Sequence, residues 1–175
     1  ARPMNAALSP TYYANKMETL IRWYEALPEE ACVEFPNLFL FASRAMSMLG
    51  QLDEALALAN GAEVAFESRG NVERALYSRM QRANIALARG RYAEVQALAQ
   101  SVLGVGEINE YHAAVAEAHR LAGVACLNLG QSSKAVEHLN TSLELFQEQE
   151  MLWEKAITVL NLSFALIRVG WVEEG

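Results

Sequence analysis

Few residues of this sequence have the type and spacing that site chemistry requires. The three histidines are His112, His119 and His138. In a helix His112 and His119 would be about 10 Å apart, too far to share one metal ion. The zinc-protease pattern H-E-x-x-H does not occur. We therefore expect structural or surface histidines and no metal site.

The motifs of nucleophilic catalysis and nucleotide binding are also missing. Neither G-x-S-x-G nor the phosphate-binding loop G-x4-G-K-[ST] occurs. Cys32 and Cys126 stand among apolar residues with no charge beside them to activate a thiolate, which predicts buried thiols in a reducing cytoplasm. GVGEIN (104–109) contains G-x-G but follows a helical pattern rather than a strand, so it is interpreted as a linker. The sequence predicts no enzyme, and no cofactor within this segment.

Charge and hydropathy exclude two further classes of partner. The net charge of −7 disfavours binding to a phosphate backbone, and the cationic cluster Arg82, Arg89 and Arg91 is interrupted by apolar residues. No apolar run approaches the length of a membrane span, and residues 1–10 lack the features of a signal peptide. We expect a cytoplasmic segment without direct nucleic-acid contact and without a membrane.

A repeat in the sequence predicts the helices on which the other candidate binding residues lie. Gly50, Gly90, Gly130 and Gly170 are spaced by 40 residues, and each opens a short polar link: GQLDEA, GRYAEV, GQSSKA and GWVEEG. All four prolines lie in the first 36 residues, and strong helix formers dominate the rest. These features predict an all-α fold built from stacked helical hairpins.

The glycine register also divides the chain. Residues 1–36 are interpreted as the end of a preceding repeat, with a helix over 11–27, and a connection. The repeats that follow are 37–70, 71–109, 110–149 and a truncated unit 150–175 that turns at Gly170. Since both ends fall inside a repeat, we expect the chain to be a single fragment of a larger protein.

Small side chains recur in phase with the glycines. Seven residues before each glycine stand Ser43, Ala83, Gly123 and Ser163. With GVACLNLGQSSKAVEHLNTSLEL, which covers both helices of one unit, this pattern resembles the tetratricopeptide repeat. The resemblance implies a right-handed superhelical stack of antiparallel helical hairpins. The period here is 40 residues rather than the family's 34, and the family's tryptophan, tyrosine and terminal proline are replaced.

A narrower pattern lies near the start of the sequence. It consists of Trp23, Glu25, Ala26, Leu27, Pro28, Pro36, Leu38, Ala42 and the GQLDEA turn. Over residues 18–65 the chain thereby resembles the opening of the repeat domain of MalT-type, LuxR-family, ATP-dependent transcriptional regulators. In that family the superhelix lies between a nucleotide-binding switch domain and a DNA-binding domain, and it receives an inducer or an inhibitory partner protein. ATP is accordingly expected only in a separate domain.

The expected function is therefore a non-catalytic sensor or docking domain of such a regulator. The alternative is a generic tetratricopeptide scaffold for protein–protein interaction without a transcriptional role. In either case the first helix of each hairpin should line a concave face that binds a protein, a peptide or a small effector. The residues expected on this face, here called the stripe, are Asn37, Arg44, Tyr77, Asn84, Glu117, Arg120, Asn128, Phe164 and Arg168.

Two further groups of apolar residues carry a prediction. Met80, Leu87, Val124 and Leu160 belong either to the stripe or to the core between helices, and the sequence leaves both possibilities open. Trp23, Trp153 and Trp171 are interpreted as packing residues.

Overall fold

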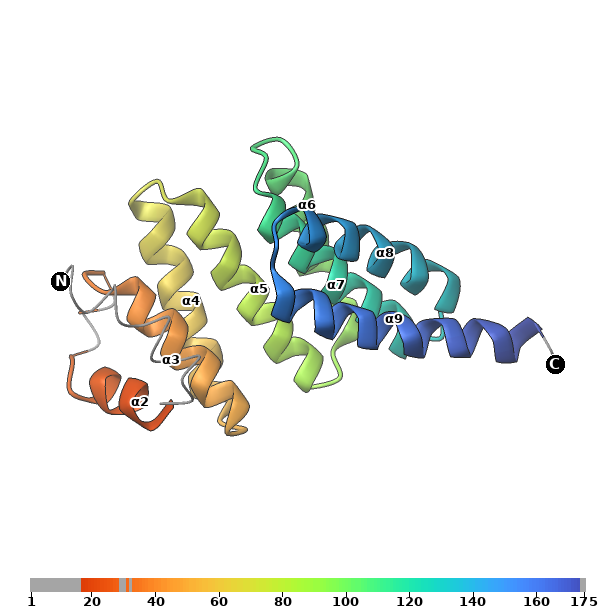
Figure 1. Cartoon of the computed structure of the whole chain (residues 1–175). Coiled ribbons are helices and arrows are strands. Elements are labelled where there is room, and N and C mark those ends of the chain that lie inside the picture. Colours follow the sequence, from red (N-terminus) through yellow and green to blue (C-terminus); the bar gives the residue numbers. More distant parts are fainter. Residues whose placement is uncertain (1–16, 29–30, 32, 174–175) are drawn as a thin grey trace. The chain divides into compact units, whose positions relative to one another are not determined.

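The computed structural model describes residues 17–28, 31 and 33–173, with side chains as far as residue 170. This part of the chain contains eight helices and no strand (Figure 1). The helices are α2 (Met17–Glu25), α3 (Pro36–Met48), α4 (Leu52–Ser68), α5 (Val72–Ala88), α6 (Tyr92–Gly106), α7 (His112–Asn128), α8 (Ser132–Glu148) and α9 (Leu152–Glu173). They fall into two compact units, residues 1–85 and 86–175.

The first unit is built around the α3–α4 hairpin. Helix α3 begins at Pro36, where a missing backbone N–H costs nothing because the first helical N–H groups have no partner within the helix. Most of α3 is buried, and α2 packs against it through the fully buried Leu20 and an edge-to-face contact between Tyr24 and Phe39. Trp23 is partly buried against the same core, as predicted.

The second unit is a run of helices in which α7 packs against α6 and α8, and α8 packs against α9. Its core is made largely of alanine, which lets the helix axes approach closely. Gly123 of α7 makes the closest approach, because a Cβ atom there would lie 2.7 Å from Leu139 Cγ of α8. Cys126 is buried beside Leu139, as predicted, whereas Cys32 lies outside the described residues.

Turns with a left-handed residue separate the helices. Gly50, Gly90 and Gly130 have φ of 80°, 70° and 77°, and these turns confirm the predicted glycine register. After each glycine the next N–H reaches back to a carbonyl of the preceding helix, as in Gln131 N to Cys126 O at 2.9 Å, which is the Schellman motif. The turns between hairpins use Gly70, Glu110 and Glu150, with φ of 66°, 58° and 56°.

Two predicted boundaries are wrong. The linker predicted over 104–109 begins too early, since α6 continues to Gly106 and the left-handed residue is Glu110. Helix α6 is extended because Val102, Leu103 and Gly106 are buried at its end. The predicted helix over 11–27 is described from Met17 and ends at Glu25; its earlier part lies outside the described residues.

Helix α9 also differs from the prediction, because it runs through Gly170 to Glu173 instead of turning there. At Gly50 and Gly130 the turn is stabilised by a second helix that packs back on the first. At Gly170 the helix continues instead. Trp153 near its start is 68% exposed and is not the packing residue that was predicted. The Trp171 side chain lies outside the described residues.

None of the described helices combines the length and hydropathy needed to cross a bilayer.

The close approach at Gly123 predicts that alanine substitutions at two helical glycines change the stability of the chain in opposite directions. Gly123→Ala should reduce the free energy of unfolding by about 1–3 kcal/mol, because the new methyl group overlaps Leu139. Gly104→Ala places its methyl in open space and should stabilise the chain by about 0.5–1 kcal/mol. Chemical denaturation measures both, and equal effects would show that α7 and α8 are packed less closely than described.

Candidate binding surface

The second unit brings part of the stripe together. Glu117, Arg120 and Asn128 lie on α7, Phe164 and Arg168 lie on α9, and the two helices contact each other. Arg168 Nη1 donates to the carbonyl of Leu127, 3.1 Å away, so the end of the α9 stripe is tied to α7 next to Asn128. Phe164 is 53% exposed. This surface therefore combines an exposed aromatic ring with an anchored guanidinium group.

Arg120 is held by a two-point ion pair with Glu117. Its Nε donates to Glu117 Oε2 at 2.7 Å and its Nη2 donates to Oε1 at 2.6 Å. Burial opposes the charge of Arg120, but the Glu117 carboxylate, with help from Glu154 of α9, outweighs this effect and raises the pKa of Arg120. The guanidinium group thus has a fixed charge and a fixed orientation.

The first unit holds the other four stripe residues on α3 and α5. Arg44 is exposed, while Asn37, Tyr77 and Asn84 are half-buried. The Arg74 guanidinium lies over the Tyr77 ring, and Asn84 donates to Met80 O one turn earlier. Asn37 Oδ1 is buried without a hydrogen-bond partner among the described residues. Tyr77 and Asn84 are therefore held by contacts within their own helix, α5.

The structure also separates the apolar positions left open above. Met80 is 2% exposed and belongs to the core, whereas Leu160 is 57% exposed and lies at the surface of α9. Leu87 and Val124 are half-buried.

Helices α7 and α8 bring two histidines together that the sequence had not paired. His119 Nδ1 and His138 Nδ1 are 3.0 Å apart, with ring centroids separated by 5.2 Å. One nitrogen donates and the other accepts, which requires that the accepting ring be unprotonated. Burial, followed by the neighbouring His138, lowers the pKa of His119. Burial also lowers the pKa of His138, with Lys134 acting in the same direction and Glu137 against it.

A second buried polar cluster joins α4 to α5 in the first unit. The buried carboxylate of Glu63 accepts from Arg79 Nε at 2.8 Å and from Arg82 Nη1 at 2.7 Å, one arginine on each oxygen. Arg79 also reaches the more exposed Glu67 at 3.1 Å. Glu63 stands seven residues before Gly70, and Arg79 and Arg82 stand nine and twelve after it. His119 stands eleven residues before Gly130 and His138 eight after it, so each cluster joins the two helices on either side of one turn. The 40-residue register does not predict these pairs, because it relates equivalent positions of different repeats and not positions that face each other on adjacent helices.

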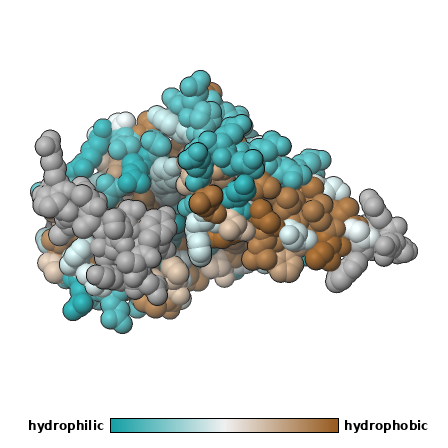
Figure 2. All heavy atoms as spheres, viewed as in Figure 1, coloured by the Kyte–Doolittle hydropathy of each residue, from teal (hydrophilic) through white to brown (hydrophobic). Residues whose placement is uncertain are grey.

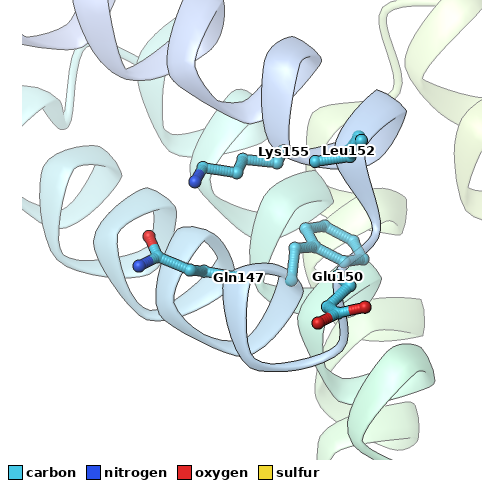
Figure 3. Close-up of a pocket in the computed structure, with 5 residues that line it drawn as sticks. Gln147, Glu150, Leu152 and Lys155 are labelled. Carbon is cyan, nitrogen blue, oxygen red and sulfur yellow. The ribbon is translucent and has the colours of Figure 1, made fainter.

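Neither cluster has the composition of a metal site. Within the described part of the chain no three histidine, cysteine or acidic residues are grouped so that they could hold a metal ion. A hollow of about 360 Å³ lies where α8 passes into α9 and is lined by Phe146, Gln147, Glu150, Leu152 and Lys155. Figure 3 shows the Glu150 carboxylate and the Lys155 ammonium group pointing in different directions. The two charged groups of the hollow therefore do not converge on one point.

Comparison with known proteins supports the fold. No protein-family model matches the chain, and no curated protein sequence matches it. Among solved structures the chain is similar to the apo form of RapI, with a TM-score of 0.70 and 16% sequence identity. The similarity covers 94% of this chain and 47% of the RapI chain, so this chain spans about half of the length of that neighbour. The predicted all-α, tetratricopeptide-like stack of helical hairpins is confirmed.

The Glu63 cluster predicts unequal effects of two conservative substitutions. Glu63→Gln leaves two arginines facing a neutral amide in a buried site and should lower the free energy of unfolding by about 1–3 kcal/mol. Glu67→Gln, at a 52% exposed side chain, should cost less than about 0.5 kcal/mol. Urea denaturation of both variants checks this, and similar losses would mean that burial of Glu63 is unimportant.

The histidine pair predicts a pH-dependent stability. Because both pKa values are lowered on folding, the unfolded chain binds more protons. The contribution of the two neutral histidines to the free energy of unfolding is complete above the ordinary histidine pKa of about 6.5. It is lost as the pH falls toward the lowered pKa values. Comparing unfolding free energies at about pH 7.5 and about pH 5.5 should show a drop that is reduced in the double variant His119→Gln, His138→Gln.

The control for this experiment is His112→Gln, which replaces an exposed histidine of the same helix. It should retain the pH dependence of the original chain. An unchanged drop in the double variant would show that other groups cause it.

Proposed function

We propose that the chain is a non-catalytic, helical-repeat sensor or docking domain of a MalT-like transcriptional regulator. It binds a partner protein or an effector on the first helices of its hairpins. Support for the regulator comes from the opening pattern around Trp23 and Pro28, and support for a binding role comes from the helical-repeat fold. ATP would act in a separate domain of the parent protein.

The binding role is supported most directly by the surface that the stripe residues of α7 and α9 form in the second unit. Exposed aromatic rings and oriented guanidinium groups are the side chains that most often contribute large binding energies at interfaces. Here Phe164 is exposed, Arg168 is anchored on Leu127 O, and Arg120 is fixed by Glu117. These arginines lose little conformational freedom when a partner binds, because their side chains are already held.

The second candidate is an interaction scaffold without a transcriptional role. The same surface would serve it, and the fold supports it without the opening pattern. The two candidates differ in what happens to transcription when the surface is occupied.

Site-specific photo-crosslinking tests the shared part of the proposal. A photoreactive residue at Phe164, in the chain produced in cells of its source, should crosslink a defined partner. The same residue at exposed Glu144 of α8 should not. Arg168→Glu should reduce the crosslink about tenfold or more, as expected for loss of an interface anchor. Equal labelling at Phe164 and Glu144 would contradict a binding role for this surface.

Transcript levels separate the two candidates. Overproduction of the chain should sequester the inducer or inhibitory partner and change the transcription of a small set of genes, and Arg168→Glu should not. A specific crosslink without any change in transcripts would favour the scaffold.

A further inference from the structure

Two histidine rings meet near the middle of the α7–α8 hairpin. His119 Nδ1 and His138 Nδ1 lie 3.0 Å apart, and both side chains are half-buried. On α7, His119 stands one helical turn before Gly123, and on α8 His138 directly precedes Leu139. Gly123 and Leu139 make the closest approach of these two helices. The histidine pair therefore bridges α7 and α8 beside their tightest contact.

The geometry of the pair limits the number of protons that it can hold. A hydrogen bond between two Nδ1 atoms needs one N–H group and one unprotonated nitrogen. Starting from two neutral rings, a first additional proton can bind to Nε2 of the donor ring, and its Nδ1–H then donates from a charged ring. A second additional proton must bind to the accepting Nδ1. Two N–H groups on two cationic rings would then face each other across 3.0 Å, so the rings must separate.

The surroundings on the same two helices add to this limit. On α8, burial and Lys134 lower the pKa of His138, and Glu137 acts in the opposite direction without outweighing them. On α7, burial and then the facing ring lower the pKa of His119. The pair therefore takes up protons more readily when the hairpin is open and both rings are in water.

Charged groups of the neighbouring positions and helices interact with other partners. Arg120, the residue after the α7 histidine, forms its two-point ion pair with Glu117, and Glu154 of α9 acts on the same guanidinium group. Lys155 of α9 lines the hollow at the end of α8. Helix α6 packs on α7, and its Glu94 pairs with the arginine three residues earlier. These groups do not compensate for two positive charges on the pair.

Separation of α8 from α7 would also divide the surface proposed for binding. Helix α9 packs mainly on α8, and it touches α7 near Leu127, whose carbonyl accepts from Arg168. The exposed Phe164 lies on α9, where Figure 2 shows apolar side chains gathered, whereas Arg120 lies on α7. Since α9 is held chiefly by α8, it should follow α8 when the hairpin opens. The stripe residues of α7 and α9 would then no longer form one surface.

We propose that the His119–His138 pair is a proton-operated latch between α7 and α8. The latch holds the two helices together while the pair carries at most one additional proton, and the second additional proton releases α8, together with α9, from α7. The first unit stays folded. Loss of partner binding in acid rests on the proposed function, whereas the latch itself is tested without any partner.

Hydrogen exchange followed by mass spectrometry measures the opening helix by helix. Protection is expressed relative to an unstructured chain at the same pH, which removes the direct effect of pH on exchange. Because opening takes up protons, protection of α8 and α9 should fall about tenfold or more between about pH 6.5 and about pH 5. Protection of α4 in the first unit should change less than about twofold.

Two asparagine variants keep the hydrogen bond and remove the limit on protons. In His119→Asn the amide oxygen accepts from a protonated His138, so α8 and α9 should keep their protection at both pH values. His138→Asn exchanges the roles of the two helices and should behave in the same way. His112→Gln, at the exposed histidine of α7, should retain the full loss of protection.

Three results of the exchange experiment would overturn the proposal. Protection of α8 and α9 that does not depend on pH would show that the charged rings simply turn into water. A loss that persists in both asparagine variants would assign the opening to other groups. An equally large loss in α4 would mean that acid unfolds the whole chain.

Nitrogen chemical shifts of the two rings test the premise in the unaltered chain. At about pH 7.5, above the ordinary histidine pKa, one ring of the pair should carry its proton on Nδ1 and the other on Nε2. Two rings protonated on Nε2 would reject the latch, since neither Nδ1 would have a proton to donate.

Discussion

The fold depends on a reversal of the chain at fixed intervals. A residue with positive φ recurs every 20 residues from Gly50 to Glu150, and each one is followed by an N–H that closes onto the preceding helix. Helices of at most 17 residues fit between these reversals in α4 to α8. In the α3–α4 and α7–α8 hairpins the position seven residues before the turn glycine meets the carbonyl five residues after it, so small residues can be repeated where these helices touch.

At equivalent positions beside these turns, side chains of different chemistry contact the next helix. At seven residues before a turn stand Ser43, Glu63 and Gly123, and each meets a different partner on the next helix: a carbonyl, two guanidinium groups and a leucine. A serine or glutamate in such a buried place is stable only when its polar atoms are satisfied. The pairing of helices is thus specified by complementary side chains as well as by apolar burial.

The glycine register and alanine-rich pattern were sufficient to predict the helices and three of the turns. The repeat boundaries at 109/110 and 149/150 were predicted, but the left-handed residues there were not, since glutamate rarely adopts positive φ. The turn predicted at Gly170 is wrong, because a glycine permits a reversal of the chain but does not require one. The stripe in α7 and α9 was assigned from register. The partners of Glu63 and His119 depend on facing helices and were therefore missed.

The order of the contacts has a consequence for how the chain folds. In the described part of the chain, the helices that pack on one another are neighbours or next neighbours along the sequence. Little chain entropy is lost before such contacts form, so helical proteins of this kind commonly fold in microseconds to milliseconds. Each hairpin can serve as a nucleus onto which the next helix is added. Hydrogen exchange should then reveal gradual opening of single helices before the whole chain unfolds.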